Sequence, residues 1–305
     1  MAASACVVGT WPFSREPVRK AMQCLSNYST SLDAVEAGIH VAEVDPNYGP
    51  YHVGCGGWQN SDLVLELDAA IMNGTDMNFG AVTALTGFAE AISVARQVME
   101  KSPHSMLTGP GAARFARAQG FQFQENMGRH PKPQMVVGVD KQRHGHDTLG
   151  ILALDKQGNI CAGVSTSGMS GKLPGRVGDS ALPGCGLYAD SQAGAACCSG
   201  DGDEILRYCP SYKVVDLLKQ GYSPQNACLS TAKEIMRRRG TRGAFEMVVI
   251  ALDNKGNQGA ANIGVHSYKD EAAGIQYAGF PFVTLSDNMT EAQVTCSPPI
   301  SEDQL

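Results

Sequence analysis

What this sequence lacks excludes several classes of protein. It has no run of about 18 apolar residues, the length that a membrane-spanning helix requires. Acidic residues outnumber basic ones, 30 to 24, and the resulting net charge of −6 argues against nucleic acid or an anionic membrane as a partner. None of the 10 cysteines forms a Cys-x-x-Cys pair, so neither a zinc site nor thioredoxin-like chemistry is indicated.

What is present favours a soluble enzyme. The 305 residues, 43% of them hydrophobic, suffice for one large α/β domain or two smaller ones. The 35 glycines are scattered along the chain, which is typical of tight turns rather than of disorder. Residues 1–8 are too short for a signal peptide, because they run directly into the first expected strand, so we expect a cytoplasmic location.

Hydrophobic periodicity predicts alternating strands and helices. The polar stretch 121–147 contains proline and histidine and is expected to be a solvated linker, as the tail before a cleavage site should be. The remaining expected elements are a strand at 4–10, helices at 16–26 and 31–43, strands near 63–72 and 79–85, helices at 88–101 and 111–118, helices near 203–219 and 223–238, and a strand at 274–283.

A β-hairpin is expected immediately after the linker. Apolar runs flank a short turn in which Gly158 takes the left-handed position, so that Asp155 and Asn159 close a three-residue loop. In that register Thr148 lies directly opposite Thr166, on the same face of the hairpin. A slip of one residue would place them on opposite faces. The same turn design recurs at 251–257, an internal repeat.

Thr148 follows Asp147 in the segment His144-Gly145-His146-Asp147-Thr148 and is well placed for chemistry. A threonine hydroxyl is a weak nucleophile that needs a base. If the chain is cut before Thr148, its new α-amino group, with a pKa near ~7.7–8, can be that base. An ordinary strand residue is the alternative. The two histidines lack a third ligand, so we expect no metal there and no cofactor.

The segment 168–188 is rich in glycine and proline, as loops that position functional groups often are. Arg176 and Asp179 lie three residues apart in it. They could form a salt bridge within the loop, or a clamp in which Arg176 binds an α-carboxylate and Asp179 an α-ammonium group. Further on, an apolar run ends at Ser199-Gly200, where a hydroxyl and a backbone N–H could form an oxyanion hole or simply a turn.

Together these segments resemble the N-terminal nucleophile (Ntn) asparaginases, and within them the glycosylasparaginase branch. The resemblance covers nearly the whole chain, and the start Thr10-Trp11-Pro12-Phe13 favours this branch over the isoaspartyl peptidases. The other matching segments are Leu32-Asp33-Ala34-Val35-Glu36, Leu67-Asp68-Ala69-Ala70-Ile71-Met72, Gly145-His146-Asp147-Thr148, Ser165-Thr166-Ser167-Gly168, Gly175-Arg176-Val177-Gly178-Asp179-Ser180 and Ala193-Gly194-Ala195-Ala196.

The resemblance implies a four-layer αββα sandwich, formed by one domain over 1–305 that self-cleavage between Asp147 and Thr148 divides into an α chain, 1–147, and a β chain, 148–305. It also implies an (αβ)2 dimer, and the family's vertebrate members are lysosomal, which is the alternative location if a signal peptide is missing from this sequence. The roles implied are nucleophile for Thr148, its support for Thr166, the substrate clamp for Arg176 and Asp179, the oxyanion hole for Ser199 and Gly200, and proximity to substrate for Trp11.

Two positions depart from the family pattern. Ser199 stands where threonine is usual, and it keeps the hydroxyl but loses the methyl group that stiffens χ1. Trp58 stands where the best-known members carry serine beside the active site, and its indole is expected to narrow the space for a sugar.

Three interpretations therefore compete. The first is an amidohydrolase that cleaves the side-chain amide of asparagine, with N4-(β-N-acetylglucosaminyl)-L-asparagine favoured and free asparagine or an isoaspartyl peptide as alternatives. The second is a precursor that never cuts itself and serves as a binding protein. The third is a threonine protease that cuts proteins after aspartate, against which the Arg176 and Asp179 clamp for a free amino acid argues.

Overall fold

The computed structural model describes residues 4–27, 29–46, 48, 53–125, 127–129, 148–240, 245–270 and 272–301. Their strands form a large mixed sheet, a smaller antiparallel sheet and a separate two-stranded ribbon. No helix in this part of the chain combines the length and the apolar character needed to cross a membrane.

The large sheet has the strand order β14-β13-β1-β5-β6-β2-β3-β4. All of its neighbours are antiparallel except β3 and β4. Its strands are β1 (Cys6–Thr10), β2 (Leu67–Asn73), β3 (Phe79–Leu85), β4 (Met106–Thr108), β5 (Leu149–Leu154), β6 (Ile160–Thr166), β13 (Phe280–Ser286) and β14 (Gln293–Ser297).

The smaller sheet has the order β10-β9-β8-β7 and is antiparallel throughout. Its strands are β7 (Leu187–Asp190), β8 (Gly194–Gly200), β9 (Met247–Asp253) and β10 (Gln258–Ile263), and the ribbon consists of β11 (Ser267–Asp270) and β12 (Ile275–Ala278).

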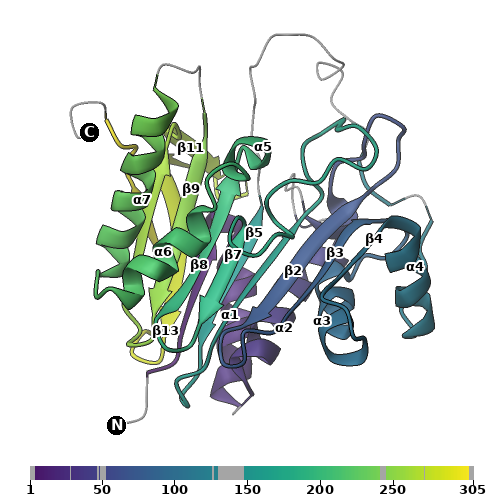
Figure 1. Cartoon of the computed structure of the whole chain (residues 1–305), viewed down its shortest axis with the longest axis horizontal. Coiled ribbons are helices and arrows are strands. Elements are labelled where there is room, and N and C mark those ends of the chain that lie inside the picture. The colour runs from purple at the N-terminus through teal and green to yellow at the C-terminus, as the bar shows by residue number, and fades with distance from the viewer. Residues whose placement is uncertain are drawn as a thin grey trace.

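Helices cover the outer face of each sheet. The helices α1, α2, α3 and α4 pack on the large sheet, whereas α6 and α7 pack on the smaller one at the opposite side of the molecule (Figure 1). Their bounds are α1 (Arg15–Ser26), α2 (Ser31–Val44), α3 (Ala91–Lys101), α4 (Gly109–Ala118), α5 (Gly202–Ile205), α6 (Pro210–Lys219) and α7 (Pro224–Arg239), with 3-10 turns at Pro12–Ser14 and Gly54–Gly56. The fold is the expected four-layer αββα sandwich.

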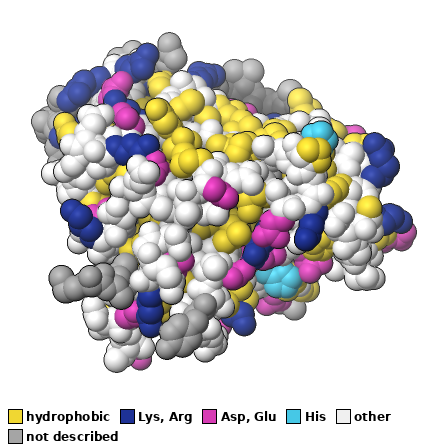
Figure 2. Space-filling model, turned by 60° about the horizontal axis from the view of Figure 1, so that its bottom comes forward, with side chains coloured by type: hydrophobic (Ala, Val, Ile, Leu, Met, Phe, Trp, Pro, Cys, Tyr) yellow, Lys and Arg dark blue, Asp and Glu magenta, His cyan; other side chains and the backbone are white. Residues whose placement is uncertain are grey.

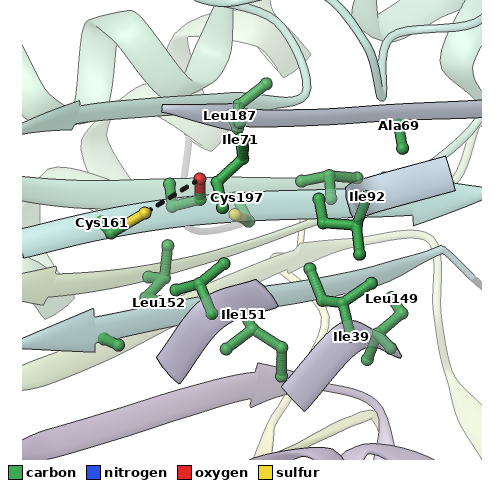
Figure 3. Close-up of a cluster of buried hydrophobic side chains, with 14 of the residues drawn as sticks. Ile39, Ala69, Ile71, Ile92, Leu149, Ile151, Leu152, Cys161, Leu187 and Cys197 are labelled. Carbon is green, nitrogen blue, oxygen red and sulfur yellow. Dashed lines mark hydrogen bonds between the residues drawn. The ribbon is translucent and has the colours of Figure 1, made fainter. Parts of the chain in front are cut away.

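The two sheets pack face to face through β5 and β6 of one and β7 and β8 of the other. Side chains alternate between the faces of each strand. Ile39 of α2 and Ile92 of α3 lie on the helix side of the large sheet, and Cys197 of β8 lies against the opposite side at Gly150 (Figure 3). The site described below lies at one end of this inter-sheet layer.

The hairpin expected after the linker is confirmed. Leu149 pairs with Ser165 and Leu154 with Ile160, which is the register that puts Thr148 opposite Thr166. Gly158 has φ 87°, and Asp155 accepts its N–H. The repeat is also confirmed, because β9 and β10 meet through an equivalent loop with φ 87° at Gly256. The expected start of the helix at 31–43 is confirmed by a capping box between Thr30 and Asp33.

Four expected bounds were wrong, each because of a local turn. The strand at 63–72 begins only at Leu67, since the Asn60 side chain accepts N–H bonds from Asp62 and Val64 and holds a turn there. The helix at 88–101 begins at Ala91. Its N-cap, Glu90, has φ −85° and ψ 53°, outside the helical region.

The other two elements are divided. The helix expected at 203–219 is two helices, α5 and α6, because Cys209 is left-handed and Pro210, which lacks an N–H, starts a new helix. The strand expected at 274–283 is divided between β12 and β13 by Gly279, whose φ is 99°.

Lys and Arg side chains are interspersed with Asp and Glu on the face shown in Figure 2. This distribution agrees with the modest acidic net charge of the whole sequence.

Candidate active site

Thr148 lies immediately before β5 and is 4% exposed. Its carbonyl oxygen accepts a hydrogen bond of 2.7 Å from the Thr10 hydroxyl, which in turn accepts one of 2.8 Å from the Gly150 N–H. Thr10 ends β1, the neighbour of β5 in the sheet. This bridge fixes the backbone of Thr148 at the end of its strand. The sequence alone did not reveal it, although Thr10 begins one of the matching segments.

Thr166 ends β6, and the hairpin register places it opposite Thr148. Gly150 lies against Cys197 of the smaller sheet. Residues two apart on a strand share a face, so the side chains of Thr148 and of its partner Thr166 also face the smaller sheet. Thr166 is also 4% exposed, and its hydroxyl accepts the N–H of Gly168 at 2.9 Å. The expected pair of neighbouring threonine hydroxyls is therefore present.

Ser199 brings a third hydroxyl to the same place from β8. Its oxygen accepts hydrogen bonds from the Thr148 N–H at 3.2 Å and from the Trp11 ring N–H at 3.0 Å. Because a hydroxyl oxygen has two lone pairs, these two donors use both of them, and the hydroxyl can contact a third group only as a donor. An oxyanion hole would use the hydroxyl in that direction.

Trp11 reaches the site through this ring nitrogen rather than through an open aromatic face. Its side chain is 5% exposed, stacks on Tyr268 with 4.9 Å between ring centroids, and meets Phe280 edge to face. Tyr268 and Phe280 cover the indole ring, so the contact that Trp11 makes with the site is its hydrogen bond to the Ser199 hydroxyl. A φ of 60°, uncommon for a residue with a side chain, turns the backbone at this point.

Gly200 follows Ser199 at the mouth of the site. Its φ is 128°, and a Cβ at this position would lie 2.3 Å from the Glu246 carbonyl oxygen. Only glycine therefore allows β8 to pass Glu246 and present this peptide to the pocket.

Arg176 lies with its guanidinium between two glycines. A Cβ on Gly178 or Gly202 would come within 2.9 Å and 3.1 Å of its nitrogen atoms. Asp203 binds one edge of the guanidinium, accepting from Nε at 3.3 Å and from Nη2 at 3.0 Å. Arg176 lines the pocket, whereas Asp203 does not. The guanidinium edge that carries Nη1 could therefore bind a ligand carboxylate.

Asp179 is 3% exposed, and its Oδ2 has no hydrogen-bond partner among the described residues. Burial raises the pKa of this carboxyl to about 7, against the opposing effect of the Arg176 charge. A buried carboxylate oxygen without a donor is costly unless a cation binds it. An α-ammonium group supplies such a cation, and Arg176 beside it supplies the partner for an α-carboxylate.

A buried ionic cluster supports the turn between Thr166 and Arg176. Lys172 has a fully buried side chain whose Nζ lies 3.9 Å from Glu66 Oε2 and 3.9 Å from Asp68 Oδ2. Burial lowers the pKa of Lys172, partly offset by these carboxylates. Asp68 is the register partner of Thr166 on β2. It lies in one of the matching segments, but nothing in the sequence indicated this role for it.

These residues enclose one pocket of about 10 Å3, a volume that holds about one water molecule. The residues that line it are Thr148, Thr166, Gly168, Met169, Arg176, Gly178, Asp179, Ser180, Gly200 and Gly202.

Not every residue singled out in the sequence lines this pocket. Trp11 and Ser199 do not line it, although the Ser199 hydroxyl contacts the Thr148 N–H. Trp58 is half-buried, and its backbone N–H donates to the Ser167 hydroxyl at 3.1 Å, one residue after Thr166. Asp147, His144 and His146 lie outside the described residues.

Comparison with known proteins agrees with this geometry. The sequence model of a family described as asparaginase matches residues 11–277. The chain belongs to the asparaginase family.

Relatives of this asparaginase-family chain are similar over most of their length. An N(4)-(beta-N-acetylglucosaminyl)-L-asparaginase of Elizabethkingia miricola is 38% identical over 280 residues, 86% of this chain and 82% of its own. The protein of the same name from Mus musculus is 35% identical over 328 residues, 95% of this chain and 91% of its own. A putative one from Drosophila sechellia is 35% identical over 309 residues, 86% and 77% of the two chains. The resemblance to the glycosylasparaginase branch of the Ntn family is confirmed.

Proposed function

We propose that this chain hydrolyses the side-chain amide of N4-(β-N-acetylglucosaminyl)-L-asparagine, with Thr148 as its N-terminal nucleophile. The observation that carries the proposal is the convergence of three hydroxyls, from Thr148, Thr166 and Ser199, beside Arg176 and the partnerless carboxylate oxygen of Asp179. The names of the relatives support the substrate.

The clamp orients the asparagine moiety. Arg176 binds the α-carboxylate by the edge that Asp203 leaves open, and Asp179 binds the α-ammonium group with the oxygen that has no other partner among the described residues. Two ionic contacts at one end of the small substrate direct its side chain toward the threonine pair. Proximity and orientation of this kind lower the barrier of the following step.

Nucleophilic attack requires a cut between Asp147 and Thr148, which converts the Thr148 N–H into an α-amino group. This group takes the proton of the Thr148 hydroxyl as its oxygen attacks the amide carbon of the substrate. The Ser199 hydroxyl and the Gly200 N–H donate to the oxyanion. The carbon–nitrogen bond then breaks, and the α-amino group returns its proton to the leaving amine.

The product of this step is an aspartyl ester on Thr148. Water attacks the ester carbon, again with the α-amino group of Thr148 as base, and aspartate leaves with the clamp still holding its α-groups. Thr166 supports the nucleophile from the adjacent strand throughout.

The leaving group decides between two candidate substrate classes. Trp58 lies next to the site through its bond to Ser167, and the enclosed volume near Thr148 is small. These observations favour a small leaving group such as ammonia, or an isoaspartyl peptide lying along the Trp58 indole, as the second candidate. Because the Trp11 ring is covered, any sugar contact comes from other residues.

A comparison of substrates tests the choice. We expect wild-type protein to cleave glycosyl-asparagine with a higher kcat/KM than asparagine or a β-aspartyl dipeptide, and Trp58→Ser to raise the first value further. If glycosyl-asparagine is not cleaved by either protein while asparagine is, the sugar assignment is wrong and the asparaginase alternative replaces it.

Self-cleavage is tested separately on a denaturing gel. Purified wild-type protein should run as two fragments, 1–147 and 148–305, and Thr148→Ala should run as one chain without activity. Thr290→Ala, at an exposed threonine, is the matched control and should cleave normally. An uncut and inactive wild type would instead support the interpretation as a non-enzymatic binding protein.

We also expect the cut protomers to pair as an (αβ)2 dimer. Light scattering of the purified protein measures this directly, and a mass equal to one 32.2 kDa protomer would contradict it.

A further inference from the structure

Cys185 and Cys209 lie close together beside the loop that carries Asp179. The Sγ atoms of Cys185 and Cys209 lie 3.7 Å apart, and the Cys185 thiol also points to the Leu206 carbonyl oxygen at 3.9 Å. Cys185 is buried, whereas Cys209 is exposed. A disulfide bond is about 2.05 Å long, so a small rotation of the two side chains brings the sulfur atoms to bonding distance.

Cys209 has a backbone conformation that cysteine rarely adopts. Its φ and ψ, 47° and 53°, lie in the left-handed region, which glycine adopts readily and residues with a Cβ rarely do. It immediately precedes Pro210, the first residue of α6. Glycine would fit this turn better but would remove the thiol that reaches Cys185.

The pair joins the two segments that build the clamp. On one side, the N–H groups of Leu182 and Gly186 donate to the Asp179 carbonyl oxygen, and the Cys185 N–H donates to that of Leu182. On the other side, α5 begins at Gly202 and carries Asp203, the partner of Arg176. A covalent link between the sulfur atoms would therefore fasten the Asp179 loop to the segment that follows Asp203.

We propose that Cys185 and Cys209 form a reversible disulfide bond when the protein meets an oxidised low-molecular-weight thiol such as glutathione disulfide. The Cys209 thiolate attacks one sulfur of glutathione disulfide, and the first glutathione leaves and takes up the proton that Cys209 lost. Cys185 then loses its proton to solvent and attacks the Cys209 sulfur, which releases the second glutathione. Two cysteine thiols are oxidised, and one glutathione disulfide is reduced to two glutathiones.

The order of these steps follows from access. Cys209 is at the surface and can meet the reagent, whereas burial shields Cys185 and raises its pKa to about 12. Cys185 is therefore the resolving thiol, which reacts only with the sulfur already beside it.

The test is to treat full-length protein with glutathione disulfide, block free thiols, digest without reduction and identify linked peptides by mass spectrometry. We expect a Cys185–Cys209 link in the wild type, reversed by dithiothreitol. Cys185→Ser should stop at a single glutathione adduct on Cys209, and Cys209→Ser should give neither link nor adduct at this place. Cys296→Ser removes another exposed cysteine and is the matched control, in which the link still forms.

The second readout is thermal unfolding, which does not depend on catalytic activity. The bond closes a ring across residues 24 apart in sequence, so the oxidised wild type should melt a few degrees higher than the reduced protein, and Cys209→Ser should show no such rise. A stable adduct on Cys209 in the wild type, a link to a different cysteine, or no reaction at all would each overturn the proposal.

Discussion

At the scale of single residues, Arg176 and Asp179, the two halves of the proposed clamp, differ in the contacts that they already make within the protein. Arg176 is already held by Asp203, whose carboxylate is 44% exposed, whereas Asp179 is buried with one oxygen unpartnered among the described residues. Asp203 thus positions the guanidinium of Arg176, whereas burial raises the pKa of the Asp179 carboxyl to about 7. Each half gives a distinct prediction.

Asp203→Asn should raise KM about three- to tenfold and leave kcat nearly unchanged. Asparagine keeps one acceptor for Arg176 but loses the charge and the two-point contact, and an exposed ion pair contributes only about 1 kcal/mol. Steady-state kinetics on glycosyl-asparagine measure the effect. A lower KM would show instead that Asp203 competes with the substrate for Arg176.

Substrate capture should weaken as the pH falls below about 7, the raised pKa of Asp179. Only the ionised carboxylate binds an ammonium group, so kcat/KM for a substrate with a free α-amino group should fall up to about tenfold per pH unit below that value. The Thr148 α-amino group, the proposed base, gives an acidic limb of its own. Asp179→Asn should therefore make the decline of kcat/KM with falling pH less steep rather than abolish it, and should lower kcat/KM by about 10- to 100-fold. An equally steep decline in Asp179→Asn would show that Asp179 does not contribute to it.

Most of the site residues could be predicted from the sequence, because they lie in short motifs and in one hairpin whose register is set by its own turn. Thr148 and Thr166 are of this kind. Thr10 and Asp203 were missed because their partners lie far along the chain or in a loop whose path no local pattern reveals. Tyr268, more than 200 residues away, stacks on the ring of Trp11, and no local sequence pattern could predict this contact.

At the scale of elements, the start of α3 depends on a buried acid. Glu43 of α2 accepts the Ile92 N–H with both carboxylate oxygens and accepts the Ser165 hydroxyl at 2.5 Å. Burial raises its pKa to about 8, although these hydrogen bonds act in the opposite direction. Ser165 precedes Thr166 on β6 and faces the helices, so this contact joins two helices to the strand that carries the site.

This arrangement predicts that stability falls as the pH rises. The folded-state pKa of Glu43 lies above the ordinary value of 4.5, so the folded protein retains a proton that the unfolded chain releases. The contribution of Glu43 to the free energy of unfolding is complete below about pH 4.5 and is lost by about pH 8. Between these values the free energy of unfolding falls by up to roughly 1.4 kcal/mol per pH unit.

Urea unfolding of the uncut Thr148→Ala protein at several pH values measures this slope, which Glu43→Gln should flatten. Glu291→Gln changes an exposed acid and is the matched control, expected to keep the slope. An equal slope in Glu43→Gln and the parent would contradict the assignment.

Element boundaries were predictable where one element's own residues decide them. The capping box at Thr30 and the turns at Gly158 and Gly256 are local, and the structure agrees with each. The division at Cys209 was not predictable, because a residue with a Cβ rarely adopts the left-handed backbone that Cys209 has.

At the scale of the whole molecule, the two expected fragments are interleaved in one sheet. β1, from the first fragment, lies between β13 and β5 of the second, and β6 of the second pairs with β2 of the first. The backbone hydrogen bonds of three strand pairs therefore cross from one fragment to the other. The overall sandwich was predicted by resemblance, but this strand order was not.

After cleavage the fragments should remain associated without any covalent bond. Gel filtration in native buffer should elute both in one peak at constant ratio, and only urea or detergent should separate them. The uncut Thr148→Ala protein, chromatographed in the same way, shows where a continuous chain elutes. Dissociation of the fragments in native buffer would contradict the pairing of β1 with β13 and β5.

If the chain cuts itself as proposed, the interleaved sheet makes refolding of the mature protein harder than folding of its precursor. The precursor has to find its native state as a single molecule, at a rate independent of its concentration. Once the peptide bond is gone, unfolding liberates two molecules, and reassembly becomes a bimolecular encounter between chains that each lack the strands needed to complete a sheet. At low cellular concentration such an enzyme persists through slow unfolding rather than through repeated refolding.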